Sequence, residues 1–134
     1  MAVLMELSRI LICEMQDLQI IELKEVDGDR KFPILIGLAE AEAIRRRLQG
    51  IKIKRPLTHE LLANVIEAFG GELESIEICD LSDHTFFARL NIRRGDGESM
   101  AIDSRPSDAS ALGIAGDVPI YVAEHVLEEA QSEL

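Results

Sequence analysis

The sequence predicts an α/β domain, with α+β as the alternative, in which helices pack on a mixed β-sheet. Strand and helix patterns follow one another in the order βββαα ββ βαβα. No internal repeat or long polar linker interrupts that order. The 134 residues, 47% of them hydrophobic, suffice for one core but are too few for two. We therefore expect residues 1–134 to form a single compact domain.

The first half of the chain starts with a predicted meander of three strands. Apolar patterns indicate strands over residues 4–13 and 18–26, and a turn at 27–29 leads into a third strand over 31–36. A meander leaves an outer edge unpaired, where another chain can add. Because two-fold dimers are the commonest closed assemblies, we expect a homo-oligomer.

Two helices are predicted to follow the meander. Apolar residues recur at helical spacing until Gly50 ends the pattern, and they are Leu38, Ala41, Ile44 and Leu48. Thr58 is a good N-cap for the second helix. The apolar stripe of that helix ends at Gly70 and comprises Leu61, Leu62, Val65, Ile66 and Phe69.

The second half alternates strands and helices more clearly. Ile76 and Ile78 mark a strand that a turn at 80–83 joins to the next strand. Apolar residues on one face of that next strand are Phe86, Ala88, Leu90 and Ile92. A strand over 99–103, a helix from Pro106, a short strand over 119–122 and a terminal helix complete the order.

The cysteines and the apolar runs indicate in which cellular compartment the protein is expected. Cys13 and Cys79 fall inside predicted strands without metal-ligand spacing, which favours buried thiols in a reducing compartment. No apolar run is long enough to cross a bilayer, and Glu6 interrupts the apolar residues at the N-terminus. We expect a cytoplasmic protein without membrane contact.

Two polar segments lie where the chain enters a predicted helix. In IDSRPSDA, residues 102–109, Pro106 suits the first helical position because its φ is fixed and it has no N–H to lose. In RPLTHELL, residues 55–62, Thr58 and His59 stand at the second helix start. Free N–H groups point outward at such positions, so both segments are candidates for binding.

These segments resemble the bifunctional nuclease domain family in combination with FPILIGLAEAEAI at 32–44, DLSDHTFFARL at 80–90 and PIYVAEHVL at 119–127. The motifs are specific together, whereas each alone is weak. The resemblance covers most of the chain, and it implies a compact α/β domain that cleaves DNA and RNA. It assigns no catalytic residues, so the chemistry rests on the local patterns.

Aspartates at these junctions suggest a site for a divalent cation. Carboxylate oxygens suit Mg²⁺ or Mn²⁺, and the candidate metal ligands are Asp80, Asp83, Asp103 and Asp108. Such an ion activates water and neutralises phosphoryl charge. The candidate catalytic residues are Asp103, Asp108 and His59, with His84 as a second candidate for proton transfer. The candidate substrate-binding residues are Arg55, Thr58, Arg105 and Ser107.

Structural roles explain the same residues without a reaction. Asp80 and Asp83 are ordinary turn formers, and Asp108 suits the first turn of a helix. Arg105 has acidic neighbours in sequence with which it can pair. If the two segments form one site, about a third of the chain separates residues that should meet around one cleft, namely Arg55, Thr58, His59, Asp103, Arg105 and Asp108. Helix starts on opposite faces would be independent caps.

The charge balance separates two classes of function. A net charge of −11 repels nucleic acid at long range. Six of the fourteen cations nevertheless lie within residues 45–55, where they can contact phosphate or simply complement a helix end. We expect a metal-assisted nuclease that binds DNA and RNA transiently, with little sequence preference. The alternative is a noncatalytic binding or regulatory module, which the acidic charge and the lack of Trp favour.

Overall fold

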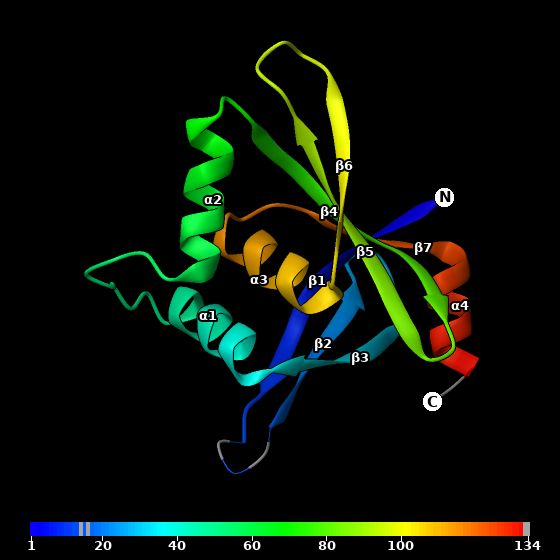
Figure 1. Cartoon of the computed structure of the whole chain (residues 1–134). Coiled ribbons are helices and arrows are strands. Elements are labelled where there is room, and N and C mark those ends of the chain that lie inside the picture. Colours follow the sequence, from blue (N-terminus) through cyan, green and yellow to red (C-terminus); the bar gives the residue numbers. More distant parts are fainter. Residues whose placement is uncertain (14, 16, 133–134) are drawn as a thin grey trace.

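A seven-stranded mixed sheet forms the centre of the molecule (Figure 1). The computed structural model describes residues 1–13, 15 and 17–132. Within these residues the strands are β1 (Ala2–Leu11), β2 (Leu18–Glu25), β3 (Lys31–Gly37), β4 (Glu72–Ser82), β5 (Thr85–Arg93), β6 (Ser99–Ser104) and β7 (Ile120–Ala123). Their order is β3-β2-β1-β7-β4-β5-β6, with β7 parallel to β4 and the other pairs antiparallel. The predicted mixed sheet of an α/β domain is confirmed.

The opening meander is confirmed, but its first strand ends earlier than predicted. β1 stops at Leu11, so Cys13 lies beyond the strand and is exposed. The buried side chain of Gln19 bonds both the N–H and the C=O of Cys13, which takes this peptide group out of the strand ladder. The prediction of a buried thiol is therefore wrong for Cys13, whereas Cys79 in β4 is half-buried and burial raises its pKa.

The hairpin between β4 and β5 turns later than predicted. β4 continues to Ser82, so Asp80 lies in the strand and the turn consists of Asp83 and His84 alone. These two residues have φ values of 51° and 63°, the left-handed conformation that a tight two-residue hairpin requires. Asp tolerates this conformation better than most residues, which accounts for its place in the turn.

The helices are α1 (Leu38–Leu48), α2 (Thr58–Ala68), α3 (Pro106–Ala115) and α4 (Glu124–Ser132). α1, α2 and α3 lie together on one side of the sheet, whereas α4 packs separately against β3, β4 and β7 (Figure 1). Among the residues that the structure describes, no helix is long and apolar enough to cross a membrane.

The sheet curls around α3, so strands far apart in its order meet. The rings of Phe32 in β3 and Phe86 in β5 lie 5.5 Å apart, centroid to centroid. α3 contacts β3, β4 and β5 as well as the two neighbouring helices, and its Ala109, Ala111 and Leu112 are buried. Small side chains let the surrounding elements approach this helix closely. The curl thus places the start of α3 beside β3 and the β4–β5 hairpin.

Candidate functional site: the start of α3

The first turns of three helices meet at the start of α3. Pro106 is the first residue of α3, as predicted, and Arg105 is the N-cap. Thr58 is the first residue of α2 instead of its cap, because Leu57 holds the cap position and makes no side-chain bond. The predicted N-cap role of Thr58 is therefore wrong by one position. N–H groups and positive dipole ends from three helices gather here, which favours negative charge.

Asp108 joins the two predicted segments. Its Oδ1 lies 3.0 Å from Nε2 of His59 in α2. Its Oδ2 accepts hydrogen bonds from Nε and Nη2 of Arg105 at 3.0 and 2.8 Å. Each carboxylate oxygen thus has its own partner, and a residue of α2 is tied to the start of α3. The prediction that the two helix starts meet is confirmed for His59, Arg105 and Asp108.

Glu40 completes this arrangement from α1. Its Oε1 lies 3.6 Å from Nη2 of Arg105, and its Oε2 accepts a hydrogen bond of 2.6 Å from the N–H of Gly37. Glu40 is not among the residues that the sequence patterns select. Its position three residues after Gly37, at the start of a helix, is the available signal, because Glu at this position often bonds back to the cap. Glu40, His59, Arg105 and Asp108 are called the Arg105 cluster below.

The Arg105 cluster is graded from buried to exposed. The side chain of His59 is 10% exposed, that of Asp108 is about one-third exposed, and that of Arg105 is 69% exposed. The hydrogen bonds from Arg105 to Asp108, followed by the attraction of the same carboxylate, raise the pKa of Arg105. Arg105 is therefore a permanent cation whose guanidinium is held by Asp108 and is otherwise open to solvent.

A cavity of about 580 Å³ adjoins Arg105. It lies between the start of α3, β3 and the β4–β5 hairpin, and it is lined by Pro33, Ile34, Leu35, His84, Thr85, Phe86, Arg105, Pro106 and Ser107. Two of the predicted substrate-binding residues, Arg105 and Ser107, are among these. The exposed His84 brings an imidazole to the same space. A cation, a hydroxyl and an imidazole beside an apolar wall can hold an anionic group and exchange a proton with it.

The remaining aspartates do not join the cluster. Asp103 pairs in register with Arg89 across β6 and β5, on the sheet face opposite the core. Oδ1 of Asp80 lies 3.5 Å from Nε2 of His125 in α4, and Asp83 forms the hairpin turn with His84. In the described part of the chain, no group of three or more His, Cys, Asp or Glu side chains is placed to hold a metal ion. The four predicted metal ligands therefore do not form one site here.

Two predicted substrate contacts also lie outside the cluster. Arg55 and Thr58 are exposed, Arg55 in the loop between α1 and α2 and Thr58 as the first residue of α2. Neither side chain takes part in the bonds around Asp108. Their binding roles remain predictions.

Comparison with known proteins identifies the family. The sequence model of the family called bifunctional nuclease domain matches residues 21–134. The chain belongs to the bifunctional nuclease domain family. An uncharacterized protein of Mycobacterium tuberculosis is 42% identical over 115 residues, which are 86% of this chain and 68% of the relative.

Two plant relatives carry the family's name. Bifunctional nuclease 1 of Oryza sativa subsp. japonica is 26% identical over 109 residues, 79% of this chain and 33% of the relative. Bifunctional nuclease 2 of the same plant is 28% identical over 105 residues, 76% of this chain and 32% of the relative. The bifunctional nuclease domain thus forms about a third of these plant proteins. All of the Arg105 cluster and its cavity fall within the matched residues.

Proposed function

We propose that this bifunctional nuclease domain hydrolyses phosphodiester bonds of DNA and RNA at the cavity beside Arg105. The observation that carries the proposal is the fixed cation itself: Asp108 holds the guanidinium of Arg105 at a cavity that also contains His84 and Ser107. The family and the two plant relatives named bifunctional nucleases support the reaction class. Contacts to phosphate, which is common to all nucleotides, account for low sequence preference.

In this proposal Arg105 binds the scissile phosphate. Nε and Nη2 face Asp108, while Nη1 makes none of these bonds and remains for a phosphate oxygen. When water attacks the phosphorus and the bond to the leaving oxygen breaks, negative charge grows on the phosphoryl oxygens. A guanidinium that is already held in place stabilises this charge without reorganising. The Ser107 hydroxyl is buried at the cavity wall and is proposed to orient the same group.

We assign proton transfer to His84 and a positioning role to His59. His84 is exposed and lines the cavity, so in its protonated form it can give a proton to the leaving oxygen, while the attacking water loses its proton to the solvent. His59 is buried and its Nε2 faces Asp108, so it orients the carboxylate that holds Arg105. Asp108 is a positioning residue in the same sense. The catalytic role predicted for Asp103 has no counterpart in this cavity, since Asp103 lies on the opposite sheet face.

Dependence on Mg²⁺ or Mn²⁺ remains a separate proposal. Both oxygens of Asp108 are occupied by His59 and Arg105, and the described residues supply no set of three ligands around it. This donor set does not fit a resident ion, so the steps above use only the side chains of the chain. Cleavage measured in magnesium, in manganese and in chelator decides whether an ion is needed.

One observation favours the alternative, a noncatalytic binding or regulatory module. The Arg105 cluster links α1, α2 and α3, and holding these helices together is enough to account for its contacts. The net charge of −11 also disfavours tight binding of nucleic acid. A module of this kind binds its partner without cutting anything.

Cleavage of fluorescently labelled single-stranded DNA and RNA distinguishes these functions. Removal of a cation that acts in the transition state should lower the rate about a hundredfold in Arg105→Gln. Arg93→Gln is the matched control, because Arg93 is also an exposed arginine paired with acids, Glu72 and Glu74 of β4. Equal rates in both variants would refute the cavity as the site. If purified wild-type protein cuts neither substrate in magnesium or manganese, the binding module replaces the nuclease.

A further inference from the structure

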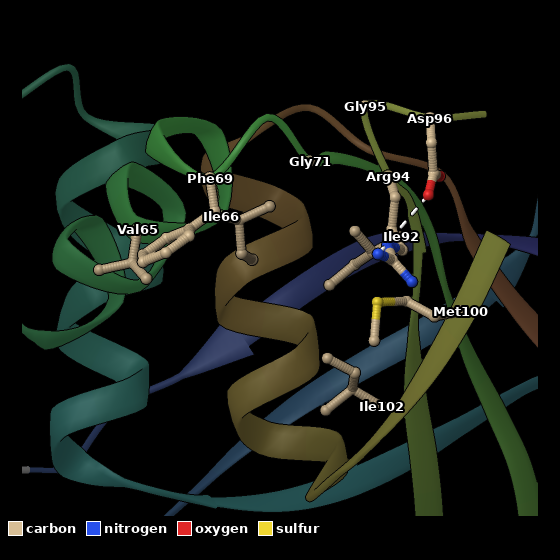
Figure 2. A pocket seen from close by; sticks show the side chains of 10 residues that line it. All are labelled: Val65, Ile66, Phe69, Gly71, Ile92, Arg94, Gly95, Asp96, Met100 and Ile102. Carbon is tan, nitrogen blue, oxygen red and sulfur yellow. Dashed lines mark ion pairs between the residues drawn. The ribbon is translucent and has the colours of Figure 1, made fainter. Parts of the chain in front are cut away.

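An apolar groove lies between α2 and β6, away from the Arg105 cavity. Its volume is about 560 Å³, and Figure 2 shows its walls: Val65, Ile66 and Phe69 on one side, and Ile92, Met100 and Ile102 on the other. The side chain of Phe69 is strongly exposed, and Met100 and Ile102 are also exposed. Exposed apolar surface of this kind marks a site of interaction. These six residues are called the α2–β6 groove.

The strand that forms one wall of the groove has a free edge. β6 is the last strand of the sheet and, among the strands described, pairs only with β5. An unpaired strand edge offers a row of N–H and C=O groups to another extended segment. Met100 and Ile102 stand opposite Ile92 and Leu90, so the groove face of β6 continues the apolar layer of the sheet. A strand added here would need apolar side chains on that face.

On the other face of the same strands, charged side chains form a row across the sheet. A strand that adds to β6 would best continue this row with a basic residue. Glu77 of β4 pairs in register with Arg89 of β5, which pairs with Asp103 of β6. Arg89 bonds Glu77 at 2.9 Å, whereas Asp103 forms no ion pair with the residues that the structure describes. The charges across β4, β5 and β6 are therefore negative, positive and negative. The last of them, the carboxylate of Asp103, lies at the free edge of the sheet. A neighbouring strand with alternating apolar and basic residues complements both faces.

The chain contains such a segment in the loop between α1 and α2. Residues 51–54 read Ile-Lys-Ile-Lys, lie outside any helix or strand, and are all exposed. Neither Lys52 nor Lys54 has an acidic partner in residues 1–13, 15 and 17–132. By contrast, the arginines of the sheet and of α3 form ion pairs, namely Arg9, Arg30, Arg89, Arg93, Arg94 and Arg105. Unpaired positive charge is concentrated here in a chain of net charge −11.

This segment is placed to reach another molecule. It ends just before the first turn of α2, whereas the groove lies along the second half of that helix and begins at Val65, about 10 Å further on. The loop also projects away from the sheet beside α1 and α2, on the side remote from β6 (Figure 1). The chain's own loop therefore does not fill the groove, whereas a second copy can bring the same segment to it (Figure 1).

We propose that residues 51–54 of one copy add to β6 of another copy as a β-strand. Ile51 and Ile53 then enter the α2–β6 groove, and Lys52 and Lys54 lie on the face that carries Asp103. Nucleic acid is the other candidate for the lysines, but it leaves the two isoleucines and the acidic end of the row unexplained. The contact joins different surfaces of the two copies, so it builds a ring, or a two-fold dimer where both loops are exchanged.

Sedimentation velocity on the whole chain tests the proposal with two variants, each of which reverses the charge on one of the two surfaces. The loop variant carries Lys52→Glu with Lys54→Glu, and the edge variant carries Asp103→Lys in β6. We expect an oligomer for the wild type and a monomer for each variant. In an equimolar mixture, the intact loop of the edge variant meets the intact edge of the loop variant, and the two reversed charges also complement each other, so association should return. A mixture that stays monomeric would overturn the proposal.

The other two lysines of the chain supply the matched control. Lys24→Glu with Lys31→Glu makes the same change of charge on β2 and β3, away from both the loop and the groove, and should keep the wild-type mass. Dissociation of this control would show an effect of net charge and overturn the proposal. So would a monomeric wild type, or a loop variant that keeps its mass but loses binding to labelled single-stranded DNA. Circular dichroism verifies folding of every variant.

Discussion

α2 and α3 are neighbours with opposite surroundings. In α3, most residues from Pro106 to Gly113 are buried, whereas in α2 only His59 is buried. The apolar stripe predicted for α2 is present, but Leu61, Leu62, Val65 and Phe69 are all exposed. α3 is held by packing on several sides, while α2 is held by the buried His59 at its start and by the partly buried Ile66 in its second half. Apolar content alone therefore does not show which helix belongs to the core.

The largest effect expected from this difference is on folding stability. Leu112→Ala in α3 removes a buried side chain and should lower the free energy of unfolding by about 2–5 kcal/mol. Leu61→Ala in α2 makes the same chemical change at an exposed position and should cost less than about 1 kcal/mol. Urea unfolding of both variants measures the contrast. Similar losses would show that the α2 stripe is covered in solution.

A smaller effect should appear when the link at the start of α2 is cut. His59→Ala leaves the Oδ1 atom of Asp108 without its partner and should cost about 1–3 kcal/mol. Because this bond ties α2 to α3, amide hydrogen exchange should accelerate in α2 and stay slow in α3. His125→Ala is a control, since His125 is an exposed histidine near Asp80. Uniform acceleration throughout the chain would mean that α2 has no separate attachment.

The smallest effect is expected for a partly buried ion pair away from both helices, Glu25 with Arg30. The hydrogen bond from Arg30, which is the largest cause, lowers the pKa of Glu25 below its ordinary value of 4.5. A lowered folded-state pKa stabilises the protein above pH 4.5, and this contribution is lost as the pH falls through the folded-state value. In Arg30→Gln, the pKa of Glu25 measured by NMR titration should rise towards 4.5. No change would show that Arg30 is not its partner in solution.

Local sequence patterns correctly predicted those features of the fold that depend on residues close together in the sequence. Pro106 begins α3 because of its own ring, and the alternation of Ala88, Leu90 and Ile92 gives the buried face of β5. The hairpin turn was misplaced because aspartate suits both a turn and an exposed strand position, and Asp80 takes the second. Local preference does not distinguish these positions, since the pairing of β4 with β5 decides between them.

The candidate site was predicted in part, and the parts that failed depend on contacts across the chain. Asp103 and Asp108 are five residues apart, yet one faces outward on a strand and the other faces inward at a helix start. The bond from Asp108 to His59 spans 49 residues, and only the fold brings these two together. Glu40 was missed for the same reason, because its partner Arg105 lies 65 residues further along the chain.

The short strand β7 has a consequence for how the chain is assembled during synthesis. β7 lies between β1 and β4, and its four residues make the only hydrogen-bonded strand pairing that joins the meander β3-β2-β1 to the ladder β4-β5-β6 within the described sheet. A nascent chain that ends before Ile120 therefore has two separate sheet fragments with their inner edges unpaired. Closure must wait until the last strand has left the ribosome. The slowest contacts to form are those of longest sequence separation, such as Val3 with Val122.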